Sequence, residues 1–514
     1  KPMRQAITWM GDRSPLDHDS PWFLAIDLGS TQLSAMLINR QTRTLHPIYW
    51  FSVSAQAGAS KSFGLPTSVY LSMTTPALSP ASDRSTEPQI TPLAVGAKAD
   101  ELADLNPATA GSPHPAEGNQ HQRMLLRHLK AHVLNSTEHL KERDLQAACS
   151  IVLATLSGFR GDLLSPATVQ CGAEGLTSGV VQTVLRQLGG VLVSSPLTVD
   201  ETYERSLCEA ILQAKLVPSR QSIGVINDGS ALLAAQRWFI EPANPPVTAS
   251  TSSFSVVCST GAIATELIAL QHDQVIQVQA YPYGDQAIQQ DVIHLLLDSL
   301  TTSANIAVAP YGPDLDAARP PLLTAFLSPR DQEAIAQDGL AACLTYDLDA
   351  LPRLGQVDAS QRQAWQTHLD ATALGRSLQQ LAQRILRSLN DHPVLQLQVG
   401  GYAGLMTRQT LEHHILWPYL HNLDPVVVRL LEELAMPSQA IEQVICGGLL
   451  YHHGAIARWL QEKFPNAQVE VARIAPPRVM PALASPQGCD RPSPIVYGMG
   501  IVLLSPSPSL EAQT

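Results

Sequence analysis

The sequence LAIDLGST at residues 24–31 carries the strongest structural signal in this chain. It belongs to a longer pattern that begins at Trp22 with a run of apolar residues typical of a buried strand. Gly29, Ser30 and Thr31 then form a turn, and a second apolar run extends to Asn39. The pattern predicts a β-hairpin with an aspartate and a glycine at its tip.

The tip of this hairpin has the composition of a phosphate-binding loop. Gly29 has no Cβ, so a phosphate can approach the backbone amides closely, and the hydroxyls of Ser30 and Thr31 can donate to phosphate oxygens. Asp27 is suited to hold a hydrated Mg²⁺ ion, which keeps its waters and takes one or two carboxylates. Because the motif is short, an ordinary hairpin turn with an aspartate at its mouth stays open as an alternative.

The rest of the chain alternates strand and helix patterns. A second strand-rich start at residues 254–269 follows a linker rich in Pro, Ser and Thr at 241–253, so we expect two similar halves. Apolar spacing predicts helices at several places, and the segment 495–504 is compatible with either strand or helix. The predicted helices are 122–147, 201–217, 286–300, 372–390 and 408–435. This alternation indicates an α/β protein, in which ligands bind at the carboxyl ends of strands.

Composition limits the classes of partner. The 514 residues carry a net charge of −12, and such an acidic surface argues against nucleic-acid binding, which needs clustered Lys and Arg. The 7 cysteines are scattered and lack metal-ligand spacing, which favours a reducing compartment. No apolar run is long enough to cross a bilayer. We therefore expect a cytoplasmic protein with no membrane and no nucleic-acid partner.

Several segments resemble, in the correct order, the ATPase domain of the heat-shock protein 70 (DnaK-type) chaperones, a branch of the actin-like ATPase superfamily. LAIDLGST resembles the first phosphate loop of the family, and VGAKAD at 95–100 resembles the segment with its catalytic lysine. VICGG at 444–448 resembles the adenosine loop. The other matching segments are LPTSVY at 65–70, the stretch 194–216, VINDGSA at 225–231, MTRQTLE at 406–412 and YGMG at 497–500.

The resemblance implies a two-lobed actin-like ATPase fold built from duplicated ribonuclease H-like domains. The first, nucleotide-binding lobe is expected at 22–243 with a subdomain inserted at about 55–135, and the second lobe at 254–490 with an insertion at about 290–400. A linker at 244–253 joins them, and a closing segment at 491–506 is expected to pack back on the first lobe. Residues 1–21 and 507–514 are expected to be tails.

The resemblance also implies roles for individual residues around ATP or ADP and Mg²⁺. Asp27 and Asp228 are expected near the metal and its waters, and Lys98 beside the γ-phosphate, where a cation stabilises developing charge. The residues expected to bind the nucleotide are Gly29, Ser30, Thr31, Gly261, Arg387, Gly447, Gly448 and Tyr451. For Lys98 an exposed surface lysine, for Asp228 a turn aspartate, and for Arg387 a solvated helix position remain the alternatives.

The second phosphate loop departs from the family. The segment CSTGAIATE at 258–266 keeps one glycine, Gly261, and the family's aspartate is replaced by Cys258 or by Ser259, depending on the register. Losing such a group commonly costs about 10²–10³ in rate, so we expect slow or lost hydrolysis, with Lys98, Asp27 and Asp228 as the catalytic residues.

The function expected from this resemblance is a chaperone-like or regulatory ATP-binding protein without a peptide-binding domain. It is expected to act on a protein partner or co-chaperone. A pseudo-ATPase scaffold with little nucleotide binding is the first alternative. A small-molecule kinase and an actin-like filament protein are the others, since fold resemblance alone does not settle function.

Overall fold

The computed structural model describes most of the chain, and the statements below concern these residues. They are 7–10, 20–29, 31–54, 58–74, 89–105, 121–130, 142–156, 171–197, 201–240, 254–272, 274–302, 320–325, 327–344, 351–472 and 492–504. The protein is a mixed α/β protein with several sheets, as predicted from the alternating patterns. It divides into two compact units. Unit 1 comprises Lys1–Ser253, Leu270–Ile276 and Ala472–Thr514, and unit 2 comprises Phe254–Ala269 and Gln277–Val471.

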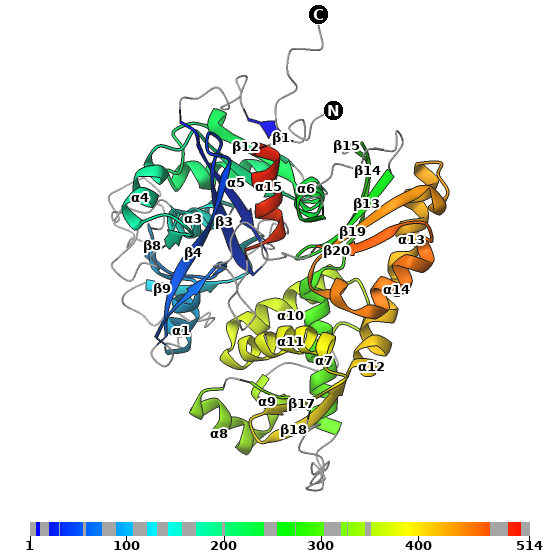
Figure 1. Ribbon diagram of the computed structural model, residues 1–514. Coiled ribbons are helices and arrows are strands. Elements are labelled where there is room, and N and C mark those ends of the chain that lie inside the picture. The colour runs from blue at the N-terminus through cyan, green and yellow to red at the C-terminus, as the bar shows by residue number, and fades with distance from the viewer. Residues whose placement is uncertain are drawn as a thin grey trace, which may run out of the picture. The chain divides into compact units, whose positions relative to one another are not determined.

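The larger sheet of unit 1 is mixed and strongly twisted (Figure 1). Its strands follow the order β1-β12-β11-β2-β3-β4-β10, with β5 on β4 and β6 on β3. They are β1 (Ile7–Trp9), β2 (Trp22–Leu28), β3 (Gln32–Asn39), β4 (Thr44–Ser54), β5 (Gly58–Ser62), β6 (Leu65–Pro66), β10 (Cys171–Ala173), β11 (Gly190–Ser195) and β12 (Ile223–Asn227). The strands β2, β11 and β12 are parallel neighbours, whereas β2 and β3 are antiparallel.

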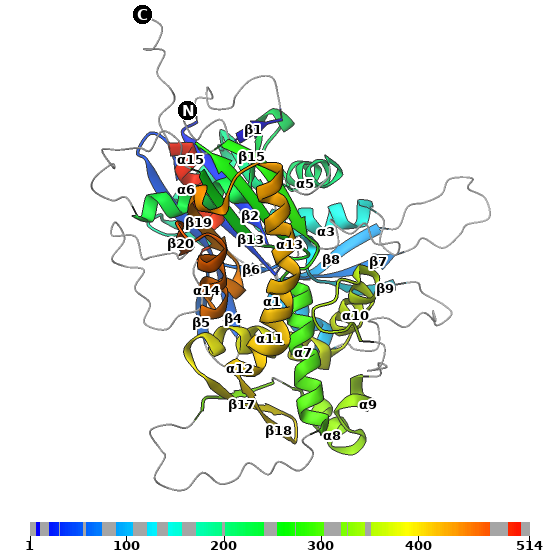
Figure 2. The ribbon, with the colours of Figure 1, turned by 90° about the vertical axis from the view of Figure 1, so that its right-hand side faces the viewer.

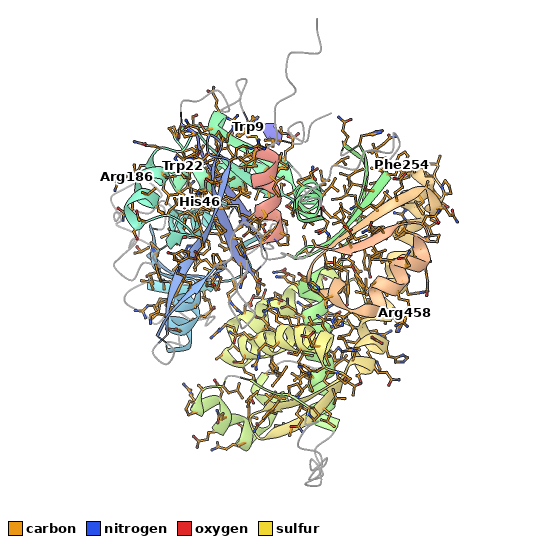
Figure 3. All side chains as sticks on the ribbon, in the orientation of Figure 1. Trp9, Trp22, His46, Arg186, Phe254 and Arg458 are labelled. Atoms are coloured by element: carbon orange, nitrogen blue, oxygen red, sulfur yellow. The ribbon has the colours of Figure 1, made fainter. Side chains whose placement is uncertain are left out.

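The hairpin predicted from residues 22–39 is confirmed. Its two strands are buried almost throughout, and Leu28 lies opposite Leu33 at the tip. At the far end, Trp22 of β2 and His46 of β4 lie close together, with ring centroids 5.7 Å apart (Figure 3). Helices cover both faces of this sheet, so its strands are apolar on both sides.

A second, antiparallel sheet of unit 1 has the order β8-β7-β9 and carries helix α1 (Ala97–Leu105). Its strands are β7 (Val69–Thr74), β8 (Gln89–Val95) and β9 (His121–Leu126). The helix predicted from residue 122 is therefore wrong at its start, because residues 121–126 pair with β7 as a strand. Helix α3 (Glu142–Ala154) covers the later part of that prediction, and residues 131–141 lie outside the described residues.

The other helices of unit 1 are α4 (Ser178–Arg186), α5 (Glu201–Gln213), α6 (Asp228–Ile240) and α15 (Pro494–Leu504). The segment near the end of the chain is thus a helix rather than a strand. Helix α15 lies against α6, and the two meet where Gly498 faces the backbone of Ala231 (Figure 1). Together with residues of β2 and β3 these helices form one of the cores of unit 1.

Unit 2 is built on a sheet with the order β15-β14-β13-β19-β20. Its strands are β13 (Phe254–Thr260), β14 (Thr265–Gln271), β15 (Gln274–Tyr281), β19 (Ile441–Gly447) and β20 (Gln468–Val471). A small sheet has the order β16-β17-β18, formed by β16 (Leu322–Thr324), β17 (Val394–Val399) and β18 (Tyr402–Thr407). One large hydrophobic core joins these strands to the helices of the unit.

The helices predicted at 286–300, 372–390 and 408–435 are confirmed. The first is α7 (Asp285–Thr302), the second α11 (Ala373–Asp391), and the two pack together (Figure 2). The third continues from α12 through a π-helical turn, Glu412–Leu416, into α13. In the third helical segment, α12 spans Arg408–Leu411 and α13 spans Trp417–Glu433. The other helices of the unit are α8 (Pro329–Asp338), α9 (Leu340–Leu344), α10 (Ala359–Ala371) and α14 (Gly454–Lys463).

The main sheets of the two units share one strand order. In unit 1 the strands follow the order β12-β11-β2-β3-β4, in which β2 and β3 form the first hairpin. In unit 2 they follow the order β20-β19-β13-β14-β15, in which β13 and β14 form the second hairpin. In both, the first strand of the hairpin has a parallel neighbour, which has a further parallel neighbour. Among the described helices, none is both long and apolar enough to cross a membrane.

Candidate functional site

Three parallel strands of unit 1 bring polar residues to one edge of the sheet. Val193 of β11 lies opposite Ile26 of β2, and Ser195 of β11 lies opposite Asn227 of β12. The residues Asp27 and Asp228, which follow Ile26 and Asn227, therefore leave their strands at the same edge. This is the position where ligands bind in open α/β sheets.

The side chains at this edge are joined by hydrogen bonds, and we call Asp27, Lys130, Ser194 and Asp228 the carboxylate site. Ser194 Oγ donates to Asp27 Oδ1 over 3.0 Å, and Lys130 Nζ donates to Asp228 Oδ2 over 3.4 Å. The hydroxyl of Ser493, just before α15, also bonds to Asp27. Within the described part of the chain, the buried Oδ1 of Asp228 has no hydrogen-bond partner.

Burial and charge act against each other in the carboxylate site. The pKa of Asp27 is raised, mainly because the carboxyl group is buried. The positive charge of Lys130 lowers this pKa and the negative charge of Asp228 raises it further. Burial lowers the pKa of Lys130, but the charges of Asp228, Tyr203 and Asp27 together outweigh it, so its pKa is raised. Lys130 is therefore an ammonium ion enclosed with two carboxyl groups.

Lys130, and not Lys98, is the cation at this site. Lys98 lies on α1 with its side chain 50% exposed and pairs with Glu101 over 2.9 Å, whereas the Lys130 side chain is 6% exposed. The chain turns after β9 at His128, which has a positive φ of 54°, and Lys130 follows two residues later. Sequence reasoning missed Lys130 because nothing in its local sequence distinguishes it from a surface lysine. The expected catalytic role of Lys98 stays a prediction.

The tip of the first hairpin is a tight turn beside the carboxylate site. The N–H of Gly29 donates to the carbonyl of Gln32 over 2.9 Å, and a Cβ on Gly29 would lie 2.8 Å from that oxygen. The carbonyl of Thr31 accepts from the N–H of Thr67 over 3.0 Å. Ser30, expected to bind phosphate, lies outside the described residues.

In unit 2, the hairpin formed by β13 and β14 makes the same turn as the hairpin of β2 and β3 in unit 1. The N–H of Gly261 donates to the carbonyl of Ala264 over 2.8 Å, which repeats the spacing of Gly29 and Gln32. Aligned on these glycines, Ser259 takes the place of Asp27, and Ala262 and Ile263 take the places of Ser30 and Thr31. Compared with the first turn, the second turn therefore has a serine in place of the aspartate and lacks hydroxyls at the places of Ser30 and Thr31.

The expected adenosine loop lies next to this second turn. Ser259 of β13 is opposite Gly447 of β19. Gly448 has a φ of 124°, and a Cβ there would lie 3.1 Å from the carbonyl oxygen of Thr260. The carbonyl of Gly261 also accepts from the N–H of Asp285 over 2.8 Å. The structure therefore gathers Gly261, Gly447 and Gly448, which we call the glycine loops of unit 2.

Two residues expected at the adenosine are placed differently. Tyr451 is 2% exposed and lies in the core of unit 2 beside Tyr419, where burial raises its pKa well above the usual range. Its side chain lies near Thr260 and Cys258, and because it is buried it offers no exposed surface for stacking. Arg387 is exposed on α11, and its charge acts on Asp285 at the start of α7.

The donors for the expected Mg²⁺ fit that ion only in part. Asp27 and Asp228 are two carboxylates on one edge, as a hydrated Mg²⁺ requires. However, Ser194 and Lys130 each already bond to one of them, and an ammonium beside the carboxylates repels a second cation. Within the described residues no three His, Cys, Asp or Glu side chains are close enough to hold a metal ion.

No protein-family model matches this chain, and a search of curated proteins finds no significant match.

Proposed function

We propose that this chain is a nucleotide-binding protein of the heat-shock protein 70 type that binds ATP or ADP and hydrolyses ATP slowly or not at all. The observation that carries this proposal is the repeated strand order of the two main sheets, each with a glycine turn at the same point of its hairpin. Such a repeat is what the duplicated, actin-like ATPase fold requires.

In this proposal the phosphates bind at the carboxylate site and the Gly29 turn, and the adenosine binds at the glycine loops of unit 2. The position of Asp27, Ser194 and Asp228 at or next to the carboxyl ends of three parallel strands supports the first part. The positive φ of Gly448 and its approach to Thr260 support the second, because both favour glycine at this turn and bring it next to the Gly261 turn. The Mg²⁺ ion stays a prediction from the resemblance.

The same proposal gives the protein a chaperone-like or regulatory role with a protein partner or co-chaperone, in the cytoplasm. All six cysteines in the described part of the chain are free thiols, which suits a reducing compartment. A ligand that binds two conformations unequally shifts their populations. Nucleotide binding would in this way change a surface that the partner reads.

A pseudo-ATPase scaffold with little nucleotide binding is the second candidate. It is favoured by the second hairpin, where Ser259, Ala262 and Ile263 replace an acid and two hydroxyls. Without the second carboxylate, no group of that turn can orient an attacking water or hold a metal-bound water.

Calorimetric titration with ATP and ADP separates the two candidates. We expect the wild-type chain to bind and Asp27→Asn to bind at least tenfold more weakly, because the Asn side chain keeps the shape but removes the charge that Ser194 and Lys130 face. Glu101→Gln, an exposed carboxylate on α1, is the control and leaves binding unchanged. Flat traces for the folded wild type would establish the scaffold instead.

A further inference from the structure

The carboxylate site contains a cation that belongs to the chain itself. The Lys130 side chain is 6% exposed, the Asp228 side chain 10%, and the Nζ–Oδ2 distance is 3.4 Å. Asp27 acts on the same ammonium through its charge. An isolated buried ammonium is very costly, so Lys130 is retained here by these two carboxyl groups together.

The ammonium lies where cationic charge would meet phosphate oxygens. Asp27 is the last residue but one of β2, Asp228 directly follows β12, and the tight Gly29 turn begins directly after β2. Asp228 is also the first residue of the 13-residue helix α6, whose N-terminus adds partial positive charge at this edge, and the N–H of Ser230 in its first turn donates to Asn227 Oδ1 over 2.7 Å. A lysine ammonium has three donors, and the hydrogen bond to Asp228 uses one of them.

We propose that Lys130 is a built-in cation that takes the place of a divalent metal ion, so that this chain binds ATP and ADP through their phosphates without Mg²⁺. The proposal rests on the nucleotide binding proposed above and specifies how that binding works. Two remaining Lys130 donors serve phosphate oxygens, and the unpartnered Oδ1 of Asp228 accepts from a water or a ligand hydroxyl.

A metal ion bound to Asp27 and Asp228 would have to displace the contact between Lys130 and Asp228. Two cations a few Å apart repel strongly when buried, and moving Lys130 into solvent would leave its long side chain without the pocket that holds it. The point charge of a lysine is an established binder of phosphate. The chain therefore has the cation it needs before the nucleotide arrives.

The first test needs no substitution. The wild-type protein is titrated with ADP and with ATP, once in excess EDTA and once in millimolar MgCl₂. We expect the two Kd values for each nucleotide to agree within about threefold. A Kd at least tenfold weaker in EDTA overturns the inference while leaving nucleotide binding intact. No binding in either buffer overturns both.

The second test removes the Lys130 ammonium and asks whether Mg²⁺ can replace it. We expect Lys130→Met to lose at least tenfold in affinity in EDTA and to recover in MgCl₂, because Asp27 and Asp228 are then free to hold the metal. Lys61→Met is the control, since Lys61 is exposed and pairs with Glu174 elsewhere in unit 1, and it leaves both Kd values unchanged. Unchanged affinity of Lys130→Met in EDTA overturns the inference.

A double variant covers the case in which Lys130→Met does not fold. Lys130→Met with Asp228→Asn removes the two opposite charges together, so that pair leaves no unpaired charge in the site. We expect it to fold and to bind weakly with and without Mg²⁺. Wild-type affinity of the double variant in EDTA would overturn the role of Lys130.

Discussion

At the scale of single residues, Asp285 gives the clearest link between burial and pH. Burial raises its pKa to about 7, and the charge of Arg387 offsets only part of this. Because the folded pKa exceeds the ordinary aspartate value of 3.8, the folded protein takes up a proton that the unfolded chain lacks. The resulting stabilisation is complete at low pH and disappears as the pH rises through about 7.

We therefore predict that Asp285→Asn removes a pH dependence of stability. The wild type should lose on the order of a few kcal/mol relative to the variant between pH 5 and pH 8, at about 1.36 kcal/mol per pKa unit. Urea unfolding at these two pH values measures the difference. The exposed Asp391→Asn serves as the control and follows the wild type. A wild type and Asp285→Asn with parallel pH profiles would show that Asp285 titrates normally.

The surroundings of single side chains are also the part of the structure that sequence predicts least well. The turn at Gly29 was predictable because the constraint is local: a Cβ there would lie 2.8 Å from the carbonyl oxygen of Gln32, three residues along the chain. The burial of Lys130, the exposure of Lys98 and the burial of Tyr451 depend on which elements pack around them. No local pattern carries that information, so the burial of Lys130 and Tyr451 and the exposure of Lys98 could not be predicted from sequence.

At the scale of elements, the closest helix contact of unit 1 depends on a missing side chain. A Cβ on Gly498 of α15 would lie 1.7 Å from the carbonyl oxygen of Ala231 in α6. The two helices can therefore pack only with glycine at this crossing. The same contact positions the segment that begins α15, from which Ser493 bonds to Asp27.

We predict that Gly498→Ala destabilises the protein by about 1–3 kcal/mol or more, because overpacking forces the helices apart. It should also weaken ATP binding, since Ser493 moves with α15. Gly179→Ala on α4 is the matched control: no atom lies within 4 Å of its added Cβ, and alanine there is neutral or stabilising by up to about 1 kcal/mol. Equal unfolding midpoints in urea for the two variants would contradict the predicted overlap.

Helices with a strong apolar periodicity were predicted well, whereas a strand that depends on pairing with a distant strand was not. Leu374, Leu378, Leu381, Ile385 and Leu389 are all buried on α11, as their spacing indicates. Leu125 and Leu126 fit a helix equally well by spacing, yet they lie in β9, because β7 offers a partner strand. A short apolar segment takes the structure that its neighbour allows, and that neighbour is distant in sequence.

At the scale of the whole molecule, the repeated strand order is the feature that sequence indicated only through its two strand-rich starts. The two hairpins keep the same glycine turn while their chemistry has diverged, with Asp27 in one and Ser259 in the other. The hydrogen bond that closes each turn joins backbone groups, so the turn tolerates this change of side chain. The two hairpins thus share a strand order and a backbone turn but differ in the polar side chains beside that turn.

The residues proposed to bind the nucleotide should be protected from amide hydrogen exchange when it binds. We predict that saturating ATP slows amide hydrogen exchange at the Gly29 turn of unit 1 and also at residues 261–264 and 447–448 of unit 2, because ligand at about 100 times Kd stabilises the bound state by about 2.7 kcal/mol. Mass spectrometry of peptic peptides measures this, and the sheet β16-β17-β18, which contains none of the proposed binding residues, serves as the internal control. Slowing in unit 1 alone would mean that the phosphates bind without the glycine loops. Asp27→Asn should abolish the slowing wherever the nucleotide causes it, because the substitution weakens nucleotide binding.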